Sequence, residues 1–297
     1  MQIRQLDQPI TSNTFTLSES SERLGWLVPT DLNETRTALL AQYQAQGYLW
    51  LKGILDREKV LDFRRRFFEA FMDTGLLVAE SAPVEGLYSG GGKGRVAKIL
   101  GEIVQWASYE AFCLSSEIWQ FYENLLGGPV YLHKRKLIRA TTLDDSCTGA
   151  HYDLTYLRAG TDRVCTSWIP IGDVPVEMGG LIYLEGSDAL GRQLEAEFSA
   201  KNSELPPEER INAYNKNMSE TGWLTKDLPS LANRLNSRWL MADYEAGDMV
   251  VHSPYMIHAS TSNTRMTMRL STDIRYQLVR DQIDPRWTSN WSPDDKL

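Results

Sequence analysis

A histidine and an aspartate stand two residues apart, at His151 and Asp153, and a second histidine, His258, follows much later in the chain. Two imidazoles and one carboxylate are a ligand set that holds non-haem Fe(II) while leaving coordination positions open for small molecules. In an extended strand, side chains two residues apart point to the same side, so His151 and Asp153 can bind one ion together. This spacing predicts an oxygen-activating enzyme whose third ligand comes from a distant part of the fold.

The chain has only four histidines, which narrows the choice of ligands. His252 lies in an apolar run and is expected to be a packed core residue, and His133 has no partner at a metal-ligand spacing. An isolated histidine is more often a structural residue than a ligand, so it is the surrounding sequence that favours His151 and His258.

An arginine downstream of His258 suits the binding of an anion. Arg269 lies among apolar and small residues in a strand-like segment, where a guanidinium group is costly to bury without a negative partner. Its planar fork of donors matches a carboxylate, and Ser260 can add a hydrogen bond. The alternative is a structural ion pair with one of the 39 acidic side chains. With the candidate ligands just upstream, a bound dicarboxylate is favoured.

The first part of the chain, residues 1–85, is expected to be a polar arm followed by helices. Apolar residues recur at intervals of three and four in 34–46 and 57–75, on either side of a short apolar strand at 47–53. A glycine-rich stretch at 89–94 lacks the ending of a phosphate loop and predicts a mobile loop near the site entrance. A further helix is expected at 115–128.

From residue 130 the pattern changes to short apolar strands separated by Gly, Asp, Asn and Pro, which is typical of a jelly roll that closes around a pocket. Strands are expected at 130–142, 151–159, 164–172, 179–187, 247–253 and 267–279. A polar, helix-prone insert at 190–236 shows no clear core face and predicts an excursion or lid. The expected fold is therefore mainly β with flanking helices, in a single domain, 1–297, with a jelly-roll core at 130–280.

Composition excludes several classes of function. The net charge of −8 and the isoelectric point near 5.2 argue against a general nucleic-acid-binding surface. The sequence shows neither a signal peptide nor an apolar run long enough for a membrane span. Cys113, Cys147 and Cys165 form no disulfide or zinc motif, so a cytoplasmic setting is expected. The oligomeric state, including a possible homodimer, stays open.

Three blocks of the sequence resemble the phytanoyl-CoA dioxygenase (PhyH) family of Fe(II)- and 2-oxoglutarate-dependent oxygenases, within a region of similarity at 98–287. The block at 151–188 contains the His-x-Asp motif, a tryptophan and a glycine-rich turn. The block at 246–263 contains the distal histidine, and the block at 265–277 contains the arginine. The resemblance implies a double-stranded β-helix core, also called a jelly roll or cupin-like fold.

The resemblance also implies the role of each matched residue. His151, Asp153 and His258 would ligate Fe(II), while 2-oxoglutarate and O2 would take the open positions. The residues that would contact 2-oxoglutarate are Arg269 and Ser260, at its distal carboxylate, Trp168, lining its pocket, and Lys98, from the N-terminal half. The family usually has a histidine where this chain has Asp188, at a position that is not a metal ligand.

The implied reaction oxidises an unactivated C–H bond of a small molecule and releases succinate and CO2. Hydroxylation is the default outcome, with desaturation or cyclisation as alternatives, and a metabolite, natural-product intermediate or amino-acid derivative is the expected substrate. The candidate substrate-facing residues are Tyr88, Tyr152, Tyr156, Arg158, Arg275, Tyr276, Arg286 and Trp287. Two other functions remain open: a cupin-like metal enzyme that does not use 2-oxoglutarate, and a non-catalytic jelly roll that binds a metabolite.

Overall fold

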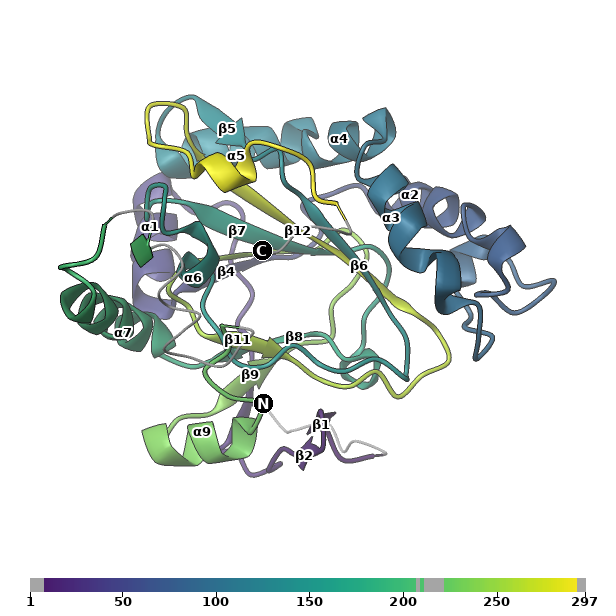
Figure 1. Cartoon of the computed structure of the whole chain (residues 1–297), viewed down its shortest axis with the longest axis horizontal. Helices are drawn as coiled ribbons and strands as arrows, with labels where there is room; N and C mark the ends of the chain where they lie inside the picture. Colours follow the sequence, from purple (N-terminus) through teal and green to yellow (C-terminus); the bar gives the residue numbers. More distant parts are fainter. Residues whose placement is uncertain (1–7, 207–208, 211–221, 293–297) are drawn as a thin grey trace.

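Two β-sheets face each other in the computed structural model, which describes residues 8–206, 209–210 and 222–292. The larger sheet has the order β4 (Tyr48–Leu51), β10 (Met249–His252), β7 (Cys165–Pro170), β12 (Arg269–Leu278) and β5 (Val130–Leu132), and β6 (Leu137–Thr141) also pairs with β12. The smaller sheet has the order β11 (His258–Ser260), β8 (Leu181–Leu184), β9 (Trp239–Met241) and β3 (Leu24–Trp26). Figure 1 shows β6, β7 and β12 above β8, β9 and β11. A separate two-stranded ribbon consists of β1 (Thr11–Ser12) and β2 (Phe15–Thr16).

Helices flank both sheets, with α4 and α5 above the larger sheet and α9 below the smaller one (Figure 1). The helices are α1 (Arg36–Gln46), α2 (Arg57–Glu69), α3 (Val96–Ile103), α4 (Ala107–Cys113), α5 (Ser116–Leu126), α6 (Leu154–Leu157), α7 (Ser187–Lys201) and α9 (Leu228–Leu235). Short 3-10 turns occur at Met72–Thr74, Pro83–Glu85, Lys93–Arg95, Val176–Met178 and Pro285–Trp287. Within the described part of the chain, helical residues outnumber strand residues, so the fold is mixed α and β rather than mainly β. No helix in that part is long and apolar enough to cross a membrane.

The helices of the N-terminal part follow the expected pattern of capping and apolar spacing. Asp56 caps α2 by accepting hydrogen bonds from two backbone N–H groups of its first turn. The aromatic residues of this helix, Phe63, Phe67 and Phe68, are buried in a core that they share with the outer face of the larger sheet. The helix ends at Glu69, earlier than expected, and Gly75 ends the following 3-10 turn with a positive φ of 74°.

The strand-rich part differs from expectation at three places. The segment 130–142 forms two strands, because the register of its pairing with β12 is interrupted between Leu132 and Leu137. The segment 151–159 is not a strand: a single bridge at His151 is followed by helix α6. Strands β9 and β11, of three residues each, were not expected, because so short a run contains too little alternation to recognise.

The insert at 190–236 does have a core face, contrary to expectation. Phe198 of α7 and Leu228 and Leu231 of α9 are buried in a cluster that includes residues of the smaller sheet. Leu190, Leu194 and Phe198 are spaced four apart, so one face of α7 carries the apolar contact. Residues 211–221, in the middle of the insert, lie outside the described residues.

A buried arginine connects α2 to the ends of the strands near Arg269. The guanidinium group of Arg64 donates to the carbonyls of Val84 (2.6 Å), Ile171 (2.9 Å), Glu85 (3.1 Å) and Met268 (3.1 Å). Burial lowers the pKa of Arg64 to about 10, which leaves it charged at neutral pH. These four bonds hold the 3-10 turn at Pro83–Glu85, the end of β7 and the turn before β12 against the helix.

Replacing Arg64 with methionine is expected to destabilise the protein by about 3 kcal/mol or more, because it leaves buried carbonyls without donors. The matched control is Arg66→Met on the same helix, where the exposed Arg66 pairs with Asp62 on the surface and about 0.5 kcal/mol or less is expected. Denaturant unfolding of the two variants measures the difference. Equal losses would contradict the role given to Arg64.

Candidate metal centre

The two candidate histidine ligands are directly opposite each other across a short antiparallel bridge. The N–H of His151 donates to the carbonyl of His258 at 3.0 Å, and the N–H of His258 donates back at 2.9 Å. Residues paired in this way have their side chains on the same face of the sheet. The two imidazole ring centroids therefore lie 4.3 Å apart although the residues are distant in sequence.

Each imidazole is oriented by the backbone carbonyl two residues before it in the chain. The Nδ1 atom of His151 lies 2.9 Å from the carbonyl oxygen of Gly149, and the Nδ1 atom of His258 lies 2.9 Å from that of Met256. A carbonyl can only accept, so Nδ1 carries the proton and Nε2 presents its lone pair. Burial lowers the pKa of both imidazoles, which keeps them neutral and able to bind a cation.

Asp153 completes the group from the start of a helix rather than from a strand. Its backbone is helical (φ −67°, ψ −28°), and its carbonyl accepts from the N–H of Tyr156 at 2.9 Å, beginning α6. Its Oδ1 atom lies 3.7 Å from Nε2 of His151 and 3.6 Å from Nε2 of His258. The structure therefore brings the three residues together, although the extended-strand geometry expected for His151 and Asp153 is wrong.

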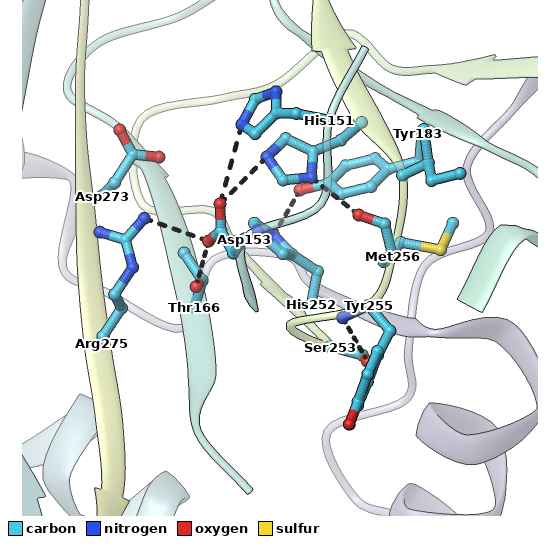
Figure 2. Close-up of polar contacts among 12 residues, drawn as sticks. His151, Asp153, Thr166, Tyr183, His252, Ser253, Tyr255, Met256, Asp273 and Arg275 are labelled. Carbon is cyan, nitrogen blue, oxygen red and sulfur yellow. Dashed lines mark hydrogen bonds and ion pairs between the residues drawn. The ribbon is translucent and has the colours of Figure 1, made fainter. Parts of the chain in front are cut away.

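The second carboxylate oxygen of Asp153 faces a different set of donors. The Thr166 hydroxyl donates to Oδ2 at 2.5 Å and the Arg275 guanidinium group donates at 3.1 Å, while Nε2 of His252 lies 3.5 Å away (Figure 2). Burial alone would raise the pKa of Asp153, but Arg275 and His252 outweigh it and hold that pKa well below its usual range. The carboxylate is therefore ionised at neutral pH.

Sequence reasoning missed the position of His252 beside this carboxylate. His252 is buried as expected, but its ring faces Asp153 and its Nδ1 lies 3.1 Å from the Tyr183 hydroxyl. Alternation within the strand places His252 on the same face as Val250, but its pairing with Thr166 across β10 and β7 depends on strand register, which the sequence does not specify. Arg275, expected to face substrate, is bound to Asp153 instead.

Arg269 is a buried cation without an acidic partner among the described residues. It donates to the carbonyl of Gly179 and, at 2.9 Å, to the hydroxyl of Thr141, while its Nε atom has no hydrogen-bond partner within the described ranges. Burial lowers its pKa to about 10, so the group remains charged at neutral pH. The structural ion pair considered as an alternative is absent from the described part of the chain.

Of the three other residues expected near 2-oxoglutarate, Ser260 and Trp168 lie on strands of the two sheets and Lys98 lies on a helix. The hydroxyl of Ser260 accepts from the N–H of Thr148 at 2.9 Å, and Ser260 lies two residues after His258 on the same strand face. Trp168 is buried on β7, two residues after Thr166, with its ring 4.7 Å from that of Tyr244. Lys98 is exposed on α3, and no contact within the described residues joins it to the metal ligands.

The remaining candidates separate into residues near the site and residues turned away from it. The ring centroid of Tyr156 lies 5.9 Å from that of His151. Tyr88 lies beneath Lys93, whose amino group binds Thr142 and Asp145 in the loop before His151. The glycine-rich stretch, which ends at Gly94, therefore contacts the loop that leads into the site.

Five candidates expected to face substrate have other contacts. The Tyr152 hydroxyl donates to Glu195 of α7 at 3.0 Å, and Arg158 pairs with the same carboxylate at 2.6 Å. Tyr276 points to the outer core, where its hydroxyl donates to the carbonyl of Cys113. Arg286 pairs with Asp284 at 2.6 Å. Trp287 is buried, and the guanidinium group of Arg275 lies over its ring at 4.4 Å.

The chain is similar in sequence to two hydroxylases. It is 24% identical over 267 residues to the 1-deoxypentalenic acid 11-beta-hydroxylase of Streptomyces exfoliatus, across 84% of this chain and 83% of that protein. The enzyme of the same name from Streptomyces arenae is 25% identical over 263 residues, with the same coverage.

Solved structures show a shared fold. The α-ketoglutarate-dependent epimerase SnoN from nogalamycin biosynthesis has a TM-score of 0.55 and 19% identity, across 84% of this chain and 85% of that chain. EctD from S. alaskensis has a TM-score of 0.55 and 14% identity, across 89% of this chain and 86% of that chain.

Residues 43–270 match the family profile described as phytanoyl-CoA dioxygenase (PhyH), and the matched segment contains the three candidate ligands and Arg269. Because this match takes in well over half of its length, the chain belongs to the phytanoyl-CoA dioxygenase family of Fe(II)- and 2-oxoglutarate-dependent oxygenases.

Proposed function

We propose that this oxygenase holds its Fe(II) with Nε2 of His151, Nε2 of His258 and Oδ1 of Asp153. The observation that carries the proposal is the convergence of three buried donors, which lie within 4.8 Å of one another, with both imidazoles already oriented by carbonyls. Two neutral imidazoles and one carboxylate fit a divalent cation in charge and donor type. Three protein ligands leave other positions open for small molecules.

Arg269 is proposed to bind the distal carboxylate of 2-oxoglutarate, with Ser260 and Trp168 beside it. Support comes from its burial, its unpartnered Nε atom and the absence of an acidic partner among the described residues. An anion there would satisfy the guanidinium group and offset the cost of burying it. Lys98 lacks such support, since it is exposed on α3.

The proposed core is a double-stranded β-helix. Support comes from two facing rows of four strands: β6, β12, β7 and β10 in the larger sheet, and the bridge segment at 150–151, β11, β8 and β9 in the smaller one. We treat the chain as one domain because the family match joins the helical N-terminal part to this core. A cytoplasmic setting is proposed because all three cysteines are free and buried.

The proposed reaction is the hydroxylation of a small natural-product-like molecule. Bound Fe(II) with 2-oxoglutarate and O2 supplies the oxidising power for a C–H bond, and succinate and CO2 are released. The protein orients the ligands and excludes competing water. Support for the substrate class comes from relatives named for 1-deoxypentalenic acid and for nogalamycin biosynthesis. The proposed substrate contacts are Tyr156, beside His151, and Tyr88, beneath Lys93, which binds the loop before His151.

Fe(II) and 2-oxoglutarate, added together without air, are expected to give a weak visible charge-transfer band, because the open positions of the site let 2-oxoglutarate chelate the metal. The band should be lost in His151→Ala and kept in His133→Asn, which changes a histidine outside the ligand set. Anaerobic absorption spectroscopy makes the measurement. Metal binding without the band would favour a cupin-like enzyme that does not use 2-oxoglutarate, and no metal binding would reject the site.

Arg269→Ala is expected to raise the 2-oxoglutarate concentration needed for half-maximal succinate release by on the order of tenfold to a hundredfold, because a charged hydrogen-bond partner is lost. Arg265→Ala, an exposed arginine four residues earlier, should leave this concentration unchanged. Thermal melting of both variants checks that they fold. An unaltered requirement in folded Arg269→Ala would reject the assigned role.

A further inference from the structure

Three side chains from adjacent strands form a row that faces Asp153. In the register of the larger sheet, Thr166 of β7 pairs with His252 of β10 on one side and with Arg275 of β12 on the other. Directly paired residues have side chains on one face, so all three point toward the same carboxylate (Figure 2). Each is at least nine-tenths buried.

Arg275 has Asp153 as its carboxylate partner and an aromatic ring as its support. Its Nη2 atom donates to Oδ2 of Asp153 at 3.1 Å, and its guanidinium carbon lies 4.4 Å from the ring centroid of Trp287. Its Nε and Nη1 atoms have no hydrogen-bond partner among the residues that the structure describes. The positive charge of the buried Arg275 is therefore compensated mainly by Asp153, and the ring of Trp287 holds the guanidinium group in place.

We infer that Thr166, His252 and Arg275 form a carboxylate cradle, in which Arg275 is a positioning residue that holds Oδ2 of Asp153 so that only Oδ1 is offered to the metal. This inference rests on the proposed metal centre. A carboxylate that binds a metal through both oxygens takes up a further coordination position. By holding Oδ2, the cradle keeps that position open for the small molecules that the reaction needs.

A cradle of this kind recognises a carboxylate whether or not the carboxylate is attached to the chain. Asp153→Gly removes the group and leaves the cradle facing the two imidazoles. Formate supplies the same two oxygens on one carbon. Added formate is therefore expected to occupy the cradle and restore part of the metal binding.

The test measures Co(II) affinity without air by visible absorption, in the absence of 2-oxoglutarate. Asp153→Gly should bind Co(II) at least tenfold more weakly than the natural chain, and 100 mM formate should recover most of that loss. The double variant Asp153→Gly with Arg275→Gln should show no recovery. Equal recovery with glutamine at position 275 would overturn the inference, because formate would then be binding to the metal without the cradle.

Two controls separate this inference from the proposed function. Asp153→Gly with Arg269→Gln should keep the formate recovery, because Arg269 is a buried arginine of the same strand that does not contact Asp153. The natural chain must also bind Co(II). Absence of that binding would reject the metal centre itself, whereas binding without Arg275-dependent recovery would reject only the cradle.

If the double variants do not fold, a second pair of variants tests whether the cradle holds Asp153. Thr166→Val removes the hydroxyl that donates to Oδ2 at 2.5 Å and keeps the side-chain shape. It is expected to lower Co(II) affinity about tenfold, the lower end of what loss of an outer-shell partner does. Thr155→Val is the matched control, because the buried Thr155 hydroxyl has no hydrogen-bond partner in the described part of the chain. Equal Co(II) affinities in the two variants would overturn the inference.

Discussion

The two backbone hydrogen bonds between His151 and His258 are the constraint on which the site depends. They join segments that are distant in sequence, and they place both imidazoles on one face because opposed residues of an antiparallel pair share a face. The bridge continues into the pairing of β11 with β8, so the smaller sheet fixes its position. Asp153 then needs only the short turn into α6 to bring its carboxylate to the two Nε2 atoms.

The charged side chains of β12 also share one face of their strand. Arg269, Asp273 and Arg275 are separated by even numbers of residues, so their side chains share one face of the strand. Arg275 stands six positions after Arg269, which corresponds to about 20 Å of strand, so the two guanidinium groups serve different anions. Arg275 is matched by a carboxylate of the chain itself, while Arg269 has none among the described residues. Arg275 is therefore suited to orient a ligand residue of the chain, whereas Arg269 is suited to bind an anion from solution.

The sequence was sufficient to predict that His151, Asp153 and His258 lie together, but not the backbone that brings them together. The spacing of His151 and Asp153 and the resemblance around His258 identified the group, and the buried Arg269 followed from its apolar surroundings. The helix at α6 was missed because Leu154–Leu157 reads equally well as a strand. The contact of Arg275 with Asp153 depends on strand register, which a single sequence does not specify. The core face of the insert was present at Leu190, Leu194 and Phe198, but its many polar residues hid it.

The most direct test of the central claim is an anaerobic crystal structure of the protein with Fe(II), located by its anomalous scattering. The account predicts one iron peak at about 2.0–2.3 Å from Nε2 of His151, Nε2 of His258 and Oδ1 of Asp153. Iron bound through an Nδ1 atom, bound by His252 in place of one of these residues, or found outside the space between the two sheets would contradict it.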